Sequence, residues 1–262
     1  MKLLHMTDIH LRAPGETVDG HDPIANFQRA LDHALQQHPD AAASIITGDL
    51  SDRGSAEDYG RLRAMLAEAP IPVHYCIGNH DDRATFLAEF PECACPEGFA
   101  QSTAPLPLGH AIMLDTFGPA SAAGHFCARR AAWLEQQLHS LPGPIWIFMH
   151  HNPVPIEVAP MDRIMLLDSE RFAGAVVPHK DKIRHIFHGH CHLHLNGAFH
   201  GIPFSAPRST NNAAWPDFTA TSHYSGSDMT QSYSVIFATP DTTMVHMVEF
   251  GYEGEIRTFS GT

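Results

Sequence analysis

The sequence has little positive charge and no long apolar run, and both features exclude classes of protein. Its 262 residues include 16 lysines and arginines against 29 aspartates and glutamates, a formal net charge of −13 with neutral histidines. This charge repels a polyphosphate backbone, so we expect no nucleic-acid partner. No stretch approaches the roughly 18 apolar residues of a membrane span, so we expect no membrane contact. The start MKLLHMTDIH has an acid where a signal peptide would be apolar, and we expect the protein to begin at Met1 and stay in the cytoplasm.

The sequence also lacks paired cysteines and internal repeats. Its five cysteines are odd in number and do not have the CxxC spacing of a structural zinc site. Free thiols are therefore expected, as in most cytosolic proteins. Cys191 lies between two histidines, but its side chain would point away from a site that both neighbours face, so it is not a candidate ligand. No period recurs and the length suits one α/β unit, so we expect a single domain over residues 1–262.

A short apolar or β-branched run that ends in a polar motif occurs five times. The runs are KLLHM before TDIH, ASIIT before GDLSDRG, VHYCI before GNHDD, IWIFM before HHNP, and IRHIF before HGHCH. Helical patterns lie between them. One begins at Pro23 after Asp22 and stops at Pro39, one opens after Ser55, and one covers residues 128–141. The alternation of strand and helix predicts an α/β fold.

The pattern changes after about residue 195. LNGAFHGIPFSA and SYSVIFATPDTTMVHMVEF have the pattern of strand, turn and strand, which predicts a β-rich second sheet at the end of the chain. Between them, residues 207–231 are rich in Ser, Thr, Asn, Gly and Pro and predict a long loop. Long loops are usually functional or mobile, so we expect this loop and the loop over residues 12–22 to border a cleft or a contact in a homo-oligomer.

Polar side chains follow the five predicted strands, where loops can assemble a site on a rigid frame. Carboxylate, amide oxygen and imidazole together are the ligands of divalent metals such as Mn, Fe, Co or Zn. Taken singly, Asp8 and Asp49 could be caps and Asn79 could be a turn residue. Their recurrence at five strand ends favours a metal site. The candidate residues are Asp8, His10, Asp49, Asn79, His80, His150, His151, His190 and His192.

In this order, TDIH, GDLSD, GNHDD, HHNP and GHCH resemble the five motifs of the calcineurin-like metallophosphoesterases, over residues 8–192. The stretch DIHLRAPGETVDGHD and the motif GNHDD resemble the corresponding sequences of one branch of this family, the bacterial class III cyclic-nucleotide phosphodiesterases and glycerophosphodiesterases. The resemblance implies a four-layer α/β/β/α sandwich and a metal-dependent phosphoric ester hydrolase. This fold suits the α/β first part of the chain and its hairpin-rich last part.

The resemblance also implies two divalent metal ions that share Asp49. The ligands of one ion would be Asp8, His10, Asp49 and His192. The ligands of the other would be Asp49, Asn79, His150 and His190. Of the remaining histidines near these motifs, His151, His188 and His194 would not be ligands.

A metal-bridging hydroxide would then attack phosphorus directly, without a covalent intermediate. His80 is the candidate acid for the leaving group. In GDxVDRG phosphatases the aspartate at the position of Asp52 pairs with the histidine of GNHE, so Asp52 would orient His80. The alternative is that Asp52 only caps the helix near Ser55.

Few cationic residues lie near the motifs, which favours a small phosphodiester over a doubly charged monoester. The candidates for substrate binding are Arg12, Arg53 and Arg208. GDLSDRG resembles the motif of protein Ser/Thr phosphatases, so a phosphomonoesterase is the alternative, although Ile77 and Asp81 replace the arginine and glutamate of those enzymes. A non-catalytic scaffold would lack ligands, and all seven are present. The acidic charge disfavours a metal-dependent nuclease.

Overall fold

Two β-sheets form the centre of the chain in a computed structural model that describes residues 1–118 and 120–259. The first sheet has the order β13-β12-β1-β2-β3, with β1 Lys2–Met6, β2 Ala43–Thr47, β3 Val73–Cys76, β12 Ser232–Ala238 and β13 Thr243–Glu249. The second has the order β4-β5-β6-β7-β9-β8, with β4 Ser102–Leu106, β5 Gly109–Met113, β6 Ile145–Phe148, β7 Ile183–Phe187, β8 Leu195–Phe199 and β9 Ile202–Ala206. A separate hairpin pairs β10 Ala213–Trp215 with β11 Ser225–Ser227.

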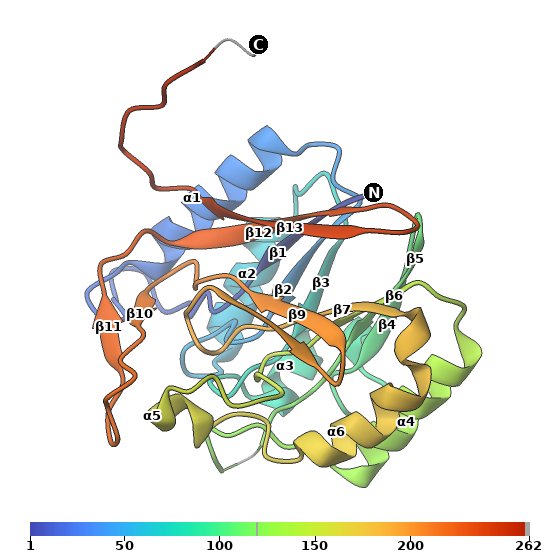
Figure 1. Cartoon of the computed structure of the whole chain (residues 1–262). Helices are drawn as coiled ribbons and strands as arrows, with labels where there is room; N and C mark the ends of the chain where they lie inside the picture. The colour runs from blue at the N-terminus through green and yellow to red at the C-terminus, as the bar shows by residue number, and fades with distance from the viewer. Residues whose placement is uncertain (119, 260–262) are drawn as a thin grey trace.

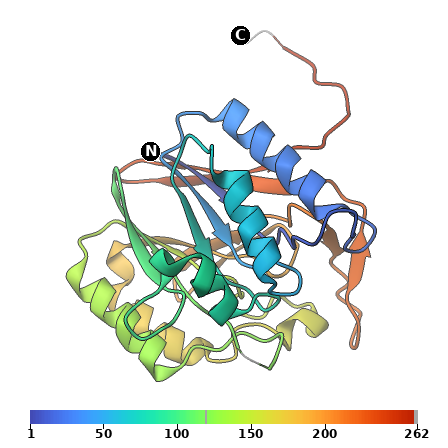
Figure 2. The same ribbon diagram turned by 180° about the vertical axis from the view of Figure 1, so that it is seen from behind.

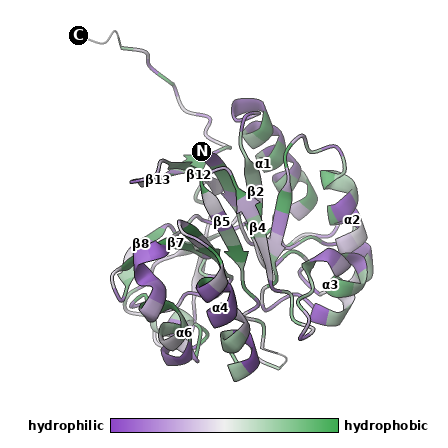
Figure 3. Ribbon diagram, turned by 90° about the vertical axis from the view of Figure 1, so that its right-hand side faces the viewer, coloured by the Kyte–Doolittle hydropathy of each residue, from purple (hydrophilic) through white to green (hydrophobic). Residues whose placement is uncertain are grey.

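Helices cover the outer faces of both sheets, as Figure 3 shows edge-on. The first sheet carries α1 Pro23–Gln37, α2 Ala56–Leu66 and α3 Arg83–Glu89, which face the viewer in Figure 2. The second carries α4 Ala128–Ser140 and α6 Ser169–Val176. The shorter helices are α5 Ala159–Asp162, η1 Pro91–Cys93 and η2 Val177–Lys182. None of the helices in the described ranges is long and apolar enough to span a membrane.

Three apolar cores hold these layers together. Between the sheets lie inward-facing residues such as Leu3, Ile45 and Trp146. A second core packs α1 to α3 against the first sheet, and a third packs α4 and α6 against the second sheet. Because residues on a strand alternate between faces, Leu3 packs between the sheets while Leu4 packs under the helices. The predicted four-layer α/β/β/α sandwich is confirmed.

The last strands do not form a separate second sheet as predicted. β12 pairs antiparallel with β1, with Leu4 opposite Val235, so β12 and β13 extend the first sheet (Figure 1). The hairpin β8-β9 instead joins the second sheet, where β9 runs parallel to β7. The sequence pattern predicts the hairpins correctly. It does not predict their sheet, because alternation specifies a buried face but not a neighbouring strand.

The five motif strands also belong to two sheets rather than one. β1, β2 and β3 are parallel neighbours in the first sheet, and β6 and β7 are parallel neighbours in the second. Their carboxyl ends still meet, since the backbone N–H of His190 after β7 donates to Asp8 after β1 at 3.0 Å. The site therefore lies where two sheet edges come together.

Candidate active site

Five of the seven predicted metal ligands have backbone angles that residues other than glycine rarely adopt. The φ angles are 54° at Asp8, 49° at His10, 48° at Asp49, 70° at His190 and 51° at His192. Each such conformation is unfavourable by about 1–3 kcal/mol and persists only where surrounding contacts enforce it. Strain of this kind at the ends of three strands indicates that the loops are shaped for a site rather than for stability.

One group of ligand atoms comes from the loops after β1, β2 and β7. Asp8, His10, Asp49 and His192 each place one such atom within 4.8 Å of the others. His10 Nε2 lies 3.2 Å from His192 Nε2 and 3.6 Å from Asp49 Oδ2. His192 Nε2 lies 3.4 Å from Asp8 Oδ1. The structure thus brings together the four residues predicted to bind the first ion.

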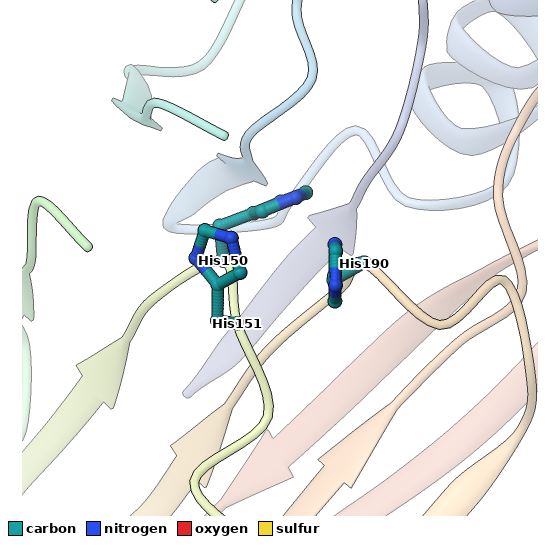
Figure 4. A group of neighbouring side chains, drawn as sticks. All are labelled: His150, His151 and His190. Carbon is teal, nitrogen blue, oxygen red and sulfur yellow. The ribbon is translucent and has the colours of Figure 1, made fainter. Parts of the chain in front are cut away.

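The other oxygen of Asp49 faces a second group. Asp49 Oδ1 lies 3.5 Å from His150 Nε2, which lies 3.1 Å from Asn79 Oδ1. His190 completes this group beside His150, with the two ring centroids 5.0 Å apart (Figure 4). His190 Nε2 is buried and has no hydrogen-bond partner, which suits an atom that binds a cation. Asp49 therefore presents one oxygen to each group, as a bridging ligand would.

His151 lies close to His150 and His190 in Figure 4, but its ring nitrogens are already bound. Its Nδ1 lies 2.8 Å from Thr116 Oγ1, and its Nε2 lies 3.2 Å from the Ala122 carbonyl oxygen. Burial, and then the neighbouring His190, lower the pKa of His151 well below its usual value. The same three histidines each place one ring nitrogen within 4.8 Å of the others, but both nitrogens of His151 already have partners, so it stays outside the predicted ligand set.

The other three side chains near GHCH each have a partner outside the two ligand groups, although His188 Nε2 is buried without one. His188 Nδ1 donates to the Gly189 carbonyl oxygen at 3.0 Å, and His194 Nε2 lies 2.7 Å from Ser232 Oγ. The Cys191 thiol donates to Asn152 Oδ1 at 3.4 Å, and burial raises the pKa of that thiol well above its usual value. A buried, protonated thiol is a poor metal ligand.

The remaining ring nitrogens show that the ligand set fits a cation. His192 Nδ1 donates to the Asn212 carbonyl oxygen at 3.0 Å, and His150 Nδ1 donates to the Thr47 carbonyl oxygen at 2.8 Å. A carbonyl oxygen only accepts, so the proton is on Nδ1 and the Nε2 lone pair faces the site. The mixture of such lone pairs with ionised carboxylates is the donor set of Mn, Fe, Co or Zn.

Charge at the site also favours a cation. Burial opposes ionisation of Asp8, but its interactions with His192 and His150 hold its pKa well below the usual range. Burial lowers the pKa of His192, but Asp8, Asp49 and the Asn212 carbonyl oxygen together raise it above its usual value. The same negative potential that draws a proton to His192 would draw a metal ion. Asp49 is held ionised in the same way, against burial, chiefly by His150.

His80 lies at the mouth of this site, with its side chain 42% exposed. Its Nδ1 donates to the Asp52 carbonyl oxygen at 3.1 Å, while the Asp52 carboxylate is 3.5 Å away. That carboxylate accepts hydrogen bonds from His10 and Arg12 instead. Asp52 therefore contacts His80 through its carbonyl oxygen, and its carboxylate lies within ion-pair distance of the same ring nitrogen. The orientation of His80 by Asp52 stays a prediction. Burial lowers the pKa of His80, and Asp49 raises it above its usual value.

Asp81 is a supporting residue that the sequence reasoning missed. Its carboxylate accepts hydrogen bonds from the backbone N–H of Gly78 at 2.8 Å, of Ser51 at 3.0 Å and of Leu50 at 3.2 Å, and from the Tyr59 hydroxyl at 3.0 Å. These bonds tie the loop of Asp49 to the loop of Asn79. Burial raises the pKa of Asp81 to about 6. The first acid of GNHDD was the available signal, but it does not indicate which backbone groups the side chain would bind.

A cavity of about 830 Å³ opens over the ligand groups. Both loops that were expected at a cleft contribute to its walls, through residues such as Asp19, His21, Asn212 and Tyr224. Residues 207–231 are not one irregular loop, because they contain the hairpin β10-β11.

The three candidate substrate arginines are placed differently from one another. Arg12 lines the cavity. Arg53 is 62% exposed and lies 3.3 Å from Glu16, and Arg208 pairs with Glu249 at 2.6 Å. Within the described ranges, neither of these two is among the lining residues.

The fold and the site together define a metal-dependent phosphoric ester hydrolase. A family model described as calcineurin-like phosphoesterase matches residues 1–194. The chain belongs to this family.

Curated relatives agree with this assignment, and a solved structure shares the fold. A probable cyclic nucleotide phosphodiesterase of Rhodopseudomonas palustris is 31% identical over 98% of this chain and 95% of its own. A cAMP/cGMP dual specificity phosphodiesterase of Mycobacterium tuberculosis is 30% identical over 98% and 82%. A glycerophosphodiester phosphodiesterase of Enterobacter lignolyticus is 31% identical over 73% and 71%. The crystal structure of a dimetal phosphatase from Danio rerio matches 95% of this chain and 96% of its own at 12% identity with a TM-score of 0.69, which shows a shared fold.

Proposed function

We propose that the chain is a dinuclear-metal phosphodiesterase that hydrolyses small phosphodiesters, of the cyclic nucleotide or glycerophosphodiester type. The observation that carries this proposal is the placement of Asp49, whose two oxygens face two separate groups of ligand atoms. The names of the relatives support the substrate class, since they include both cyclic nucleotide and glycerophosphodiester phosphodiesterases.

The residues of the chain would hold the ions and the substrate in fixed positions. Bound divalent ions would supply an activated water and positive charge for in-line phosphoryl transfer. The first ion would be held by Asp8, His10, Asp49 and His192, and the second by Asp49, Asn79, His150 and His190. The Nδ1 hydrogen bonds of His150 and His192 to carbonyl oxygens fix the orientation of their rings.

His80 would protonate the departing alkoxide. Its Nδ1 proton is held by the Asp52 carbonyl oxygen at 3.1 Å, so the proton available for transfer is on Nε2. Its side chain lines the cavity, and its raised pKa favours the protonated ring near neutral pH.

The charge of the cavity supports a diester rather than a monoester. Arg12 is the arginine of the described residues that lines it, and this guanidinium is neutralised by Asp52. Asp19 and Asp228 add negative charge to the wall. A doubly charged monoester would meet more repulsion here than a singly charged diester.

The composition of the wall supports a substrate with a planar apolar group. Met161, Ile164 and Tyr224 are among the residues that line the cavity. Met161 belongs to a small buried apolar cluster that includes Cys191 of the GHCH motif, and Ile164 packs against this cluster. A nucleobase would bury against such a surface, whereas a glycerol group would gain less from it.

A hydrolysis panel with added Mn²⁺ tests the proposal. Cyclic nucleotides, glycerophosphodiesters and bis(p-nitrophenyl) phosphate should be cleaved with higher kcat/KM than p-nitrophenyl phosphate. Asp49→Asn should abolish this activity, whereas Asp241→Asn should retain it because Asp241 is an exposed carboxylate in the turn before β13. A clear preference for the monoester would support the phosphomonoesterase alternative, and inactivity of the metal-loaded protein would support the scaffold.

A cytoplasmic location and a homo-oligomeric state are also part of the proposal. Cell fractionation tests the location. Analytical ultracentrifugation of the metal-loaded protein tests the oligomeric state.

A further inference from the structure

Arg12 and Asp52 are joined by two hydrogen bonds beside the ligand groups. Arg12 Nε and Nη2 both donate to Asp52 Oδ2, at 2.8 and 2.5 Å. Arg12 Nη1 donates to the carbonyl oxygen of Thr17 at 3.0 Å. All three nitrogens of the guanidinium therefore bind the protein, and the side chain is only 22% exposed. Few of its donors remain for a substrate.

The other oxygen of Asp52 faces a predicted metal ligand. Asp52 Oδ1 accepts from His10 Nδ1 at 3.2 Å, and His10 Nε2 points toward Asp49 and His192. Because Arg12 uses Oδ2 and His10 uses Oδ1, both contacts exist at once. The backbone N–H of Asp52 also donates to the Leu11 carbonyl oxygen at 3.0 Å, which brings the two loops together.

We infer that Arg12 is a positioning residue of the metal centre rather than a substrate-binding residue. It fixes the Asp52 carboxylate, and Asp52 in turn fixes the ring and the tautomer of His10. The inference rests on the metal site of the proposed function. A carboxylate that accepts from the free nitrogen of a ligating histidine orients the ring and increases its basicity.

Arg12 also determines which histidine the Asp52 carboxylate contacts. His80 Nδ1 lies 3.5 Å from Asp52 Oδ1, at the limit of hydrogen-bond distance, whereas His10 Nδ1 lies 3.2 Å from the same oxygen. Without the hydrogen bonds from Arg12, a small rotation of the Asp52 side chain would bring its carboxylate closer to His80 and away from His10. The two bonds from Arg12 to one oxygen oppose that rotation.

Calorimetry with Mn²⁺ and with inorganic phosphate separates the two roles of Arg12. In Arg12→Gln, one of the two bound Mn²⁺ ions should bind about 10- to 100-fold more weakly, the usual effect of losing a partner of a ligating histidine. The affinity of Mn²⁺-saturated Arg12→Gln for inorganic phosphate should stay within about twofold of the wild-type value, because at saturation the bound ion holds His10 in place. Arg12→Lys should recover part of the Mn²⁺ affinity, since it keeps one charged donor.

Arg63→Gln is the matched control, because Arg63 donates to the carboxylates of Glu89 and Glu92 at 2.8 and 3.2 Å away from the cavity. It should bind Mn²⁺ like the wild type. The inference is overturned if Arg12→Gln and Arg12→Lys bind Mn²⁺ like the wild type, whether or not they lose phosphate affinity. Failure of the wild type to bind Mn²⁺ would instead overturn the proposed function and this inference with it.

Discussion

Replacement of His80 with alanine tests whether this residue supplies the leaving-group proton. The backbone N–H of residue 80 donates to Asp49 Oδ1 at 2.9 Å, and this bond survives the substitution. The His80 ring contacts His10 edge-on, with centroids 4.7 Å apart, but it belongs to neither of the two predicted ligand sets. We therefore expect His80→Ala to keep both ions. The rate should fall by about 10² to 10⁴, the usual share of general acid catalysis, or about 3 to 5 kcal/mol in activation free energy.

The assay is a series of aryl phosphodiesters whose leaving groups differ in pKa. An acidic leaving group departs without a proton, so the loss in His80→Ala should shrink as the leaving group becomes more acidic. Metal content is measured on the same samples by elemental analysis. Equal losses across the series would make His80 a ground-state contact. Loss of a metal ion would make His80 a ligand, and either result would refute the reasoning.

Two further substitutions probe a buried histidine of β7 and the buried cysteine of the GHCH motif. Burial lowers the pKa of His185 from 6.5 to about 4 in the folded state. Between pH 6.5 and pH 4 the unfolded state therefore binds more protons than the folded state, so the free energy of unfolding falls as the pH falls through this range. This histidine should lower the free energy of unfolding by on the order of 3 kcal/mol across that pH range. Urea unfolding at pH 7 and pH 4.5 should show that His185→Gln removes this contribution. A pH dependence equal to that of the wild type would contradict the assignment. Cys191→Ser should keep both ions, since the thiol contacts Asn152; loss of an ion on elemental analysis would make Cys191 a ligand.

The convergence of the site residues could be predicted from the sequence because each ligand directly follows an apolar strand. The runs at residues 2–6 and 43–47 match β1 and β2. Local signals of this kind need no knowledge of the tertiary fold. The helix caps are equally local, since Asp22 accepts from the N–H of Ala25 and Ser55 from that of Asp58, as their spacing predicts.

The partner of Asp52 could not be predicted in the same way. Its position three residues after Asp49 places it near both His10 and His80, and spacing alone does not choose between them. The choice depends on Arg12, whose side chain is held by the loop that follows it. Likewise, the pairing of β12 with β1 joins residues from opposite ends of the chain, such as Lys2 and Phe237, and no local pattern specifies such a neighbour.

Hydrolysis of a 3′,5′-cyclic nucleotide by the metal-stripped protein, followed as Mn²⁺ is added, tests the central claim most directly. Bound metal is measured in parallel by elemental analysis. The proposed site predicts no hydrolysis without metal, and full activity only as the content approaches two ions per chain. It also predicts that Asp49→Asn stays inactive at any Mn²⁺ concentration. Hydrolysis by the metal-free protein, or full activity with one ion per chain, would contradict a dinuclear phosphodiesterase bridged by Asp49.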